Sequence, residues 1–126
     1  MELLIDRKSI KPIYEQIVDQ IKEQVMSGGL KPGDQVTSVR VLASELQIGA
    51  LTVQKAYDIL QKQGIIEGVV GKGTIISKNS IAEVELAKDI AVENKIRELV
   101  ETAQKYNTPK EQLIKLLEMY YEQGVK

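Results

Sequence analysis

The chain of 126 residues contains no cysteine and no histidine. Thiol nucleophiles, imidazole general bases and the usual zinc ligands are therefore missing, which excludes most classes of enzyme and of structural zinc site. Tryptophan and phenylalanine are also absent, so five tyrosines supply all the aromatic residues, 4% of the chain. Because 43% of the residues are hydrophobic, a core can form, and we expect it to consist of Ile, Leu and Val.

Long apolar runs are absent as well. No uncharged stretch approaches the ~18 residues that a membrane span needs, and charged side chains interrupt the first ten residues, unlike a signal peptide. We therefore expect a cytoplasmic protein without membrane contact. The carboxylates and tyrosines are scattered along the chain, and their spacing does not bring them together in one site. We therefore expect no enzyme activity, no metal and no cofactor.

The charge of the chain has no dominant sign. The chain has 17 Lys and Arg residues and 18 Asp and Glu residues, which gives a net charge of −1. Many DNA-binding domains are strongly basic, and this chain is not. Any affinity for nucleic acid must therefore come from where the charges are placed.

The first helix is expected after the N-terminal ten residues. Pro12 stands at a first helical position, and Gly28 and Gly29 end the run. Between them, apolar residues recur at steps of three and four, which is typical of an amphipathic helix: Tyr14, Ile17, Ile21 and Val25. The Pro-Gly segment that follows predicts a tight turn.

Two more helices follow, separated by a short connection. Ser38 is a good N-cap for a helix over residues 38–46. After residues 47–50, the apolar spacing predicts a third helix over about residues 51–63, with Gly64 as its stop. The polar face of this third helix, which includes Thr52, Gln54, Lys55 and Asp58, is left for a partner.

A β hairpin is expected next. Residues 65–67 and 74–76 are short β-type runs, and residues 68–73 between them are rich in glycine. A helix, a short turn, a second helix and a hairpin form the order of a winged helix-turn-helix, in which one helix enters a DNA major groove and the wing lies beside it. We assign residues 1–79 to this DNA-binding domain.

The remaining residues, 80–126, predict a helical pair. Residues 80–83 and 108–111 match capping boxes, which announce helices over residues 81–106 and 109–123. Two helices joined by a short turn cannot bury their apolar stripes alone, so we expect them to form a homodimer. The predicted dimerisation residues are Ile96, Leu99, Ala103, Tyr106, Leu113, Leu116, Leu117 and Tyr120. The fold class is thus α+β, mostly α, with a winged helix-turn-helix followed by a helical pair.

Five ordered segments resemble the GntR family of transcriptional regulators, and within it the small YtrA-type members. They are residues 11–17, 27–34, 38–43, 52–57 and 71–74, and the resemblance covers essentially the whole chain. It implies a bacterial repressor that binds a pseudo-palindromic operator in double-stranded DNA as a homodimer. The resemblance also implies that the C-terminal part serves dimerisation, because about 47 residues after Asn79 are too few for an enclosed metabolite pocket. The sequence does not identify an effector.

The predicted DNA-binding residues lie on the second helix, on the third helix and in the wing. Three of them, Arg40, Thr52 and Gly71, match contact positions of the family. The complete set is Arg40, Gly49, Ala50, Leu51, Thr52, Gln54, Lys55, Gly71, Lys72 and Gly73. Six of these ten also have a structural explanation: Arg40, Gln54 and Lys55 as solvated side chains, Thr52 as the cap of the third helix, and Gly71 and Gly73 as turn residues.

The sequence departs from the family where DNA is read. Residues 49–51 stand where relatives often carry Asn, Ser, Thr or Arg, and Gln54 stands where Arg is frequent. Val69 and Val70 replace polar or basic wing residues. These departures and the near-neutral charge support an alternative, a winged-helix module for protein–protein interaction whose sequence-specific DNA binding is weak or lost. A loop that binds nucleotide phosphates is not expected, because the spacing around residues 71–74 differs from the P-loop pattern.

Overall fold

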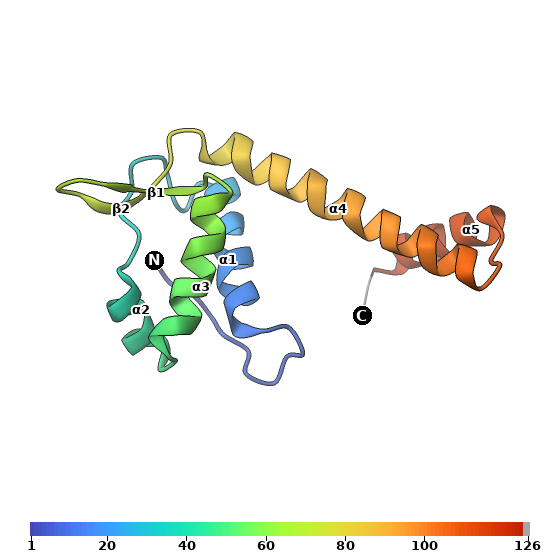
Figure 1. The fold of residues 1–126 in the computed structure, drawn as a ribbon, viewed down its shortest axis with the longest axis horizontal. Coiled ribbons are helices and arrows are strands. Elements are labelled where there is room, and N and C mark those ends of the chain that lie inside the picture. Colours follow the sequence, from blue (N-terminus) through green and yellow to red (C-terminus); the bar gives the residue numbers. More distant parts are fainter. Residues whose placement is uncertain (125–126) are drawn as a thin grey trace. The chain divides into compact units, whose positions relative to one another are not determined.

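The computed structural model describes residues 1–124, and in that range the chain forms five helices and one antiparallel two-stranded sheet. The elements in chain order are α1 (Ile13–Ser27), α2 (Val39–Leu46), α3 (Ala50–Lys62), β1 (Ile66–Val69), β2 (Gly73–Ile76), α4 (Ser80–Lys105) and α5 (Lys110–Gln123) (Figure 1). This order confirms the predicted fold class. No helix among the described residues is long and apolar enough to cross a bilayer.

Contacts within the chain define two compact units, Met1–Ala87 and Lys88–Lys126. The first unit contains α1, α2, α3, both strands and the start of α4. The second contains the rest of α4 and α5. The functional boundary that we place between residues 79 and 80 stays a prediction.

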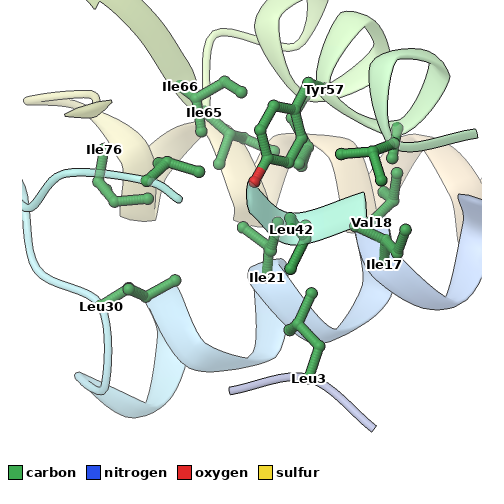
Figure 2. Close-up of a cluster of buried hydrophobic side chains, with 14 of the residues drawn as sticks. Leu3, Ile17, Val18, Ile21, Leu30, Leu42, Tyr57, Ile65, Ile66 and Ile76 are labelled. Atoms are coloured by element: carbon green, nitrogen blue, oxygen red, sulfur yellow. The ribbon is translucent and has the colours of Figure 1, made fainter. Parts of the chain in front are cut away.

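The core of the first unit is aliphatic, as predicted. Helices α1 and α3 pack side by side (Figure 1), and α2, the strands and the first turn of α4 close the core around them. Burying one such side chain stabilises the fold by about 1.5–3 kcal/mol. Figure 2 shows part of this cluster, whose fully buried members include Ile17, Ile21, Leu42, Val53, Leu60, Ile65, Ile66 and Ile76.

Several predicted helix ends are confirmed. The hydroxyl of Ser38 accepts the backbone N–H of Val41 at 3.3 Å, so Ser38 caps α2. Gly28 ends α1 in the left-handed region, with φ of 85°, and Gly64 follows α3 with φ of 74°. Such positive φ values cost glycine little, which is why it stands at these two helix ends.

Other predicted helix ends are wrong, either by one residue in position or in the group that caps the helix. Pro12 is the N-cap of α1, not its first helical residue. The capping box at residues 80–83 does not form, because α4 already includes Ser80, whose hydroxyl is buried without a hydrogen-bond partner. The box at residues 108–111 is also wrong: the Thr108 N–H bonds to Ala103 and so closes the preceding helix, and Pro109 is the N-cap of α5.

The wing is tighter than predicted. Strand β1 extends through Gly68 and Val69, and β2 begins at Gly73, so a three-residue turn replaces the predicted six-residue loop. The turn closes tightly because Gly71 adopts a φ of 81° and the Lys72 N–H donates to the Val69 carbonyl at 3.0 Å.

The second edge of β2 is occupied by the loop that precedes α2. The N–H of Val36 donates to the Thr74 carbonyl and that of Gly33 to the Ile76 carbonyl, both at 2.8 Å. The side-chain amide of Gln35 donates to the Lys72 carbonyl at 2.7 Å. These bonds attach the wing to the loop that leads into α2.

Tyr57 connects α3 to the same loop. Its ring is buried in the core, as predicted, and its hydroxyl donates to the Thr37 carbonyl at 2.6 Å. Burial raises the pKa of the Tyr57 phenol well above its ordinary value, and the nearby Glu45 carboxylate raises it further. The hydroxyl therefore remains a donor at alkaline pH.

Tyr57→Phe is expected to lower the free energy of unfolding by about 1 kcal/mol at pH 8, because the Thr37 carbonyl loses its donor. Above about pH 10 the phenol ionises in the unfolded chain but not in the fold, so wild-type stability should fall by up to about 1.4 kcal/mol per pH unit through this residue. The difference between wild type and variant should therefore shrink between pH 8 and pH 11. Urea unfolding at both pH values measures it, and a difference independent of pH would contradict the assignment.

Candidate nucleic-acid interface

Helices α2 and α3 form a helix-turn-helix. Residues 47–49 connect them, and Gln47 takes the left-handed conformation with φ of 55°. The Ile48 N–H bonds back to the Ala43 carbonyl at 3.0 Å, and Gly49 is the N-cap of α3. The turn therefore leads directly from the end of α2 into the exposed first turn of α3.

The outer face of α2 carries Arg40. Leu42 and Ala43 are buried against the rest of the unit, whereas Arg40 is exposed. It borders a shallow hollow of about 390 Å³ that is lined by Ser38, Arg40, Val41, Ser44 and Glu45. Its guanidinium is thus placed where a phosphate or a base edge could approach.

The start of α3 presents small and apolar residues. Gly49 and Ala50 are exposed, and Leu51 is 86% exposed. Thr52 is half-buried in the first turn of α3. The prediction that Thr52 caps this helix is wrong, because the N-cap is Gly49, which offers no side chain. A residue inside the helix cannot serve as its N-cap.

Gln54 and Lys55 are exposed on α3, and both have partners within the chain. The Gln54 amide donates to the Asp58 carboxylate at 2.8 Å. The Lys55 ammonium lies 4.0 Å from the centre of the Tyr14 ring, a cation–π distance. Contact of either side chain with DNA would have to compete with these interactions, and both stay predicted DNA-binding residues.

The wing contributes Gly71, Lys72 and Gly73, all exposed. Gly71 and Gly73 both have positive φ, which supports their role as turn residues and leaves a DNA contact as an additional prediction. Lys72 and Gly73 border a cleft of about 580 Å³ between the wing, the loop before α2 and the first turn of α2. The cleft is lined by Gln35, Val36, Thr37, Ser38, Val39, Val41, Tyr57, Lys72, Gly73 and Thr74.

The two hollows adjoin each other and bring together some of the predicted DNA-binding residues. Ser38 and Val41 line both of them, so Arg40, Lys72 and Gly73 lie around one continuous surface. None of the predicted residues between Gly49 and Lys55 lines either hollow. They reach solvent from the turn and the first half of α3.

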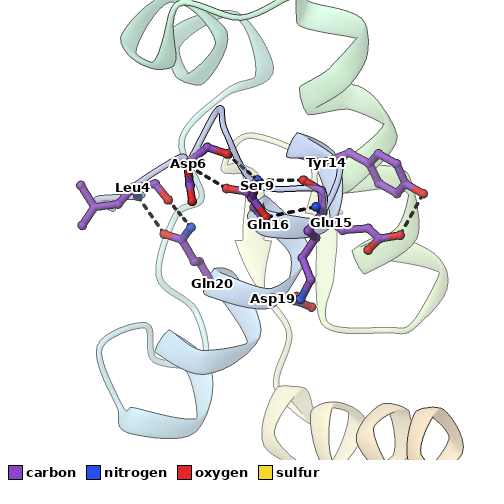
Figure 3. Close-up of polar contacts among 9 residues, drawn as sticks. Leu4, Asp6, Ser9, Tyr14, Glu15, Gln16, Asp19 and Gln20 are labelled. Atoms are coloured by element: carbon purple, nitrogen blue, oxygen red, sulfur yellow. Dashed lines mark hydrogen bonds and ion pairs between the residues drawn. The ribbon is translucent and has the colours of Figure 1, made fainter. Parts of the chain in front are cut away.

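The N-terminal segment contributes interactions that the sequence analysis missed. Side-chain amides on one face of α1 bind the extended backbone of this N-terminal segment. Gln16 exchanges hydrogen bonds with Asp6, and Gln20 with Leu4 (Figure 3). The Gln24 amide donates to the Glu2 carbonyl. The glutamines recur every four residues of helix, a rise of about 6 Å, and their partners recur every two residues of extended chain, a rise of about 6.6 Å. The spacing of the glutamines therefore matches the spacing of the backbone groups that they bind. The repeat of glutamine at positions 16, 20 and 24 was the signal that could have found this contact.

The predicted dimerisation residues lie in the second unit. Most are exposed within one chain, among them Leu117 at 60% and Tyr120 at 54%. Ala103 is buried and Leu113 is half-buried within the described chain. The remaining exposed members are Ile96, Leu99, Tyr106 and Leu116. These residues stay predicted contacts between two copies.

Comparison with known proteins agrees with this geometry. The model of the bacterial regulatory proteins of the gntR family matches residues 13–76, the segment from α1 through β2. The HTH-type transcriptional repressor YtrA of Bacillus subtilis is 42% identical over 96 residues, which cover 76% of this chain and 74% of that protein.

Solved structures extend the similarity into the C-terminal helices. A protein of Listeria monocytogenes EGD-e, described as a transcriptional antiterminator, is 36% identical, with a TM-score of 0.68 over 96% of this chain and 90% of that one. YtrA from Sulfolobus acidocaldarius, a GntR-family transcription factor, is 31% identical, with a TM-score of 0.57 over 96% of this chain and 97% of that one. The chain described here belongs to the GntR family of bacterial regulatory proteins.

Proposed function

We propose that this protein is a cytoplasmic transcriptional repressor that binds a pseudo-palindromic operator in double-stranded DNA as a homodimer. In this proposal residues 1–79 bind DNA and residues 80–126 hold the dimer. The observation that carries it is the exposure of Arg40, of Ala50 and Leu51 at the start of α3, and of the wing turn, in a chain of the GntR family. A repressor of Bacillus subtilis at 42% identity supports the direction of regulation.

The expected mode of binding follows from how α3 is packed. Val53, Ala56 and Leu60 are buried, which turns Leu51, Gln54 and Lys55 toward solvent. A helix with its first residues exposed in this way fits a major groove. Lys72 and Gly73 of the wing border the same cleft as Val39 and Val41 of α2, the neighbours of Arg40. Arg40 and Lys72 would contact phosphates or base edges, and the exposed Leu51 would meet apolar groups.

The homodimer is supported by exposed apolar side chains in the second unit. Ile90, Val92, Ile96, Leu99 and Leu117 are between 46% and 60% exposed in the single chain. Soluble monomers rarely leave this many large apolar residues in contact with water on neighbouring turns. Pairing two copies covers them and relates the two DNA-reading surfaces by a two-fold axis, so half-sites about one helical turn, ~34 Å, apart are expected.

A second candidate is a winged-helix module for protein–protein interaction with weak or lost sequence-specific DNA binding. Val70, at the tip of the wing, is fully exposed and apolar, and the net charge of −1 supplies little general attraction to DNA. This candidate predicts no selective binding to any operator. The next experiment therefore decides between the two.

Wild-type protein is expected to bind the DNA upstream of its own gene, with an affinity that falls as salt rises. Arg40→Gln should weaken this binding at least about fivefold, because a phosphate or bidentate base contact is worth about 1–3 kcal/mol. Lys62→Gln is the matched control: Lys62 is exposed at the other end of α3, and its loss removes the same charge.

Fluorescence anisotropy over a salt series, with scrambled DNA as competitor, measures these affinities. Equal effects of Arg40→Gln and Lys62→Gln would remove Arg40 from the interface. No salt-dependent, selective binding at micromolar protein would contradict the repressor and favour the interaction module.

Leu117→Glu is expected to weaken self-association at least about tenfold, because it replaces about 1.5–3 kcal/mol of apolar burial by a buried charge. Sedimentation equilibrium measures the monomer–dimer constant. Ile10→Glu, at a fully exposed apolar position in the first unit, is the control and should leave the constant unchanged. A monomeric wild type, or equal effects of both variants, would argue against dimerisation through α5.

A further inference from the structure

Arg7 contacts the end of α2 from a segment that precedes all the helices. Its guanidinium Nη2 donates to the Leu46 carbonyl at 2.6 Å and to the Gln47 carbonyl at 3.3 Å. Residues 7 and 46 are 39 positions apart in the sequence, so this is a tertiary contact. The contact lies at the start of the turn between α2 and α3.

The chemistry of this contact suits the end of a helix. The last carbonyls of a helix have no partner within it, and they carry the negative end of the helix dipole. A guanidinium supplies both a positive charge and more than one N–H donor, so it can satisfy two neighbouring carbonyls at once. The last turn of α2 contains no basic residue of its own.

The turn has few side chains that could hold it from within. Gly49, the N-cap of α3, has no side chain, and Gln47 stands in the left-handed region, which is unfavourable for a residue other than glycine. The backbone of the turn is closed by the Gln47 N–H to Ser44 at 3.3 Å and the Ile48 N–H to Ala43 at 3.0 Å. The bonds from Arg7 add an anchor from outside the helix-turn-helix.

The segment that carries Arg7 is itself fixed to α1. The Gln16 side chain accepts the N–H of Asp6 at 2.8 Å and donates to the carbonyls of Asp6 and Lys11, both at 2.9 Å. These bonds fix the backbone on both sides of Arg7. Gln20 binds Leu4, closer to the N-terminus (Figure 3). Gln24 binds Glu2. The contact thus links the packed helix α1 to the turn that leads into α3.

We propose that Arg7 is a positioning residue for DNA reading: anchored through α1, it holds the turn after α2 and thereby the exposed first turn of α3, without contacting DNA. The proposal rests on the DNA-binding function proposed above. It assigns the N-terminal ten residues a role in how the recognition helix is presented.

The test compares three variants of the full chain. Arg7→Ala removes the bonds to α2. Lys8→Ala removes an equal charge from the next residue, whose side chain makes none of these contacts. Gln16→Ala leaves every charge in place and loosens the segment around Arg7. Each is measured for affinity to the DNA upstream of its own gene over a salt series, and for hydrogen exchange of the backbone N–H groups of Gln47, Ile48 and Leu60.

Arg7→Ala is expected to weaken binding about tenfold and to speed exchange at Gln47 and Ile48 by a similar factor, the size of effect that loss of a charged hydrogen bond produces. Its salt slope should equal that of wild type, because no phosphate contact is lost. Exchange at Leu60, in the core of α3, should not change. Gln16→Ala should accelerate the same two amides, and Lys8→Ala should change neither exchange nor binding.

Three results would overturn the proposal. A salt slope lower by about one would show that Arg7 contacts a phosphate directly. Equal losses of affinity in Arg7→Ala and Lys8→Ala would show an effect of charge alone. Unchanged exchange at Gln47 and Ile48 would show that Arg7 does not hold the turn. If wild-type protein binds no DNA, the proposed function fails, and the exchange data still decide whether Arg7 anchors the turn.

Discussion

The packing of α3 is the constraint on which the rest of the structure depends. Val53, Ala56, Tyr57 and Leu60 are buried at helical spacing against α1 and the strands, and a helix buried along one face must expose the other. The exposed face begins with Ala50 and Leu51, the first two residues of the helix. The hydrophobic core therefore both stabilises the first unit and determines which side chains are offered to a partner.

Polar contacts then attach the neighbouring segments to this packed helix. The Tyr57 hydroxyl holds the loop before α2, that loop pairs with β2 and bonds to the wing turn, and Arg7 reaches the end of α2 from the N-terminal segment. Each bond is worth only about 1 kcal/mol in stability. Their shared effect is geometric, since they join the loop, the wing and the turn to one core.

Sequence reasoning predicted the features that follow from periodicity and turn chemistry. The helices and the Ser38 cap were predicted because each depends on residues close together in the chain. The aliphatic character of the core was predicted from composition, since the chain has few aromatic residues. The capping box at Ser80 was wrong because α4 begins one residue earlier than predicted: the Glu83 N–H bonds to the Asn79 carbonyl, and the Ser80 hydroxyl is buried without a partner. The hydrogen bonds of Arg7 and the hydrogen bond from Tyr57 to Thr37 could not be predicted, because they join segments that are distant in the sequence and meet only in the folded chain. At the candidate site, exposure of the first turn of α3 was predictable, whereas the partners of Gln54 and Lys55 were not.

The central claim is that two copies of this chain place their wings beside DNA about a two-fold axis. Because the chain has no cysteine, a single thiol can be introduced by Val70→Cys at the exposed tip of the wing and labelled with an iron–EDTA cleavage reagent. Bound to the DNA upstream of its own gene, the labelled protein should cut at two clusters of positions symmetric about the operator centre, and a label at Ile10→Cys should give a different pattern. A single cluster, or diffuse cutting equal to that of free reagent, would contradict the account.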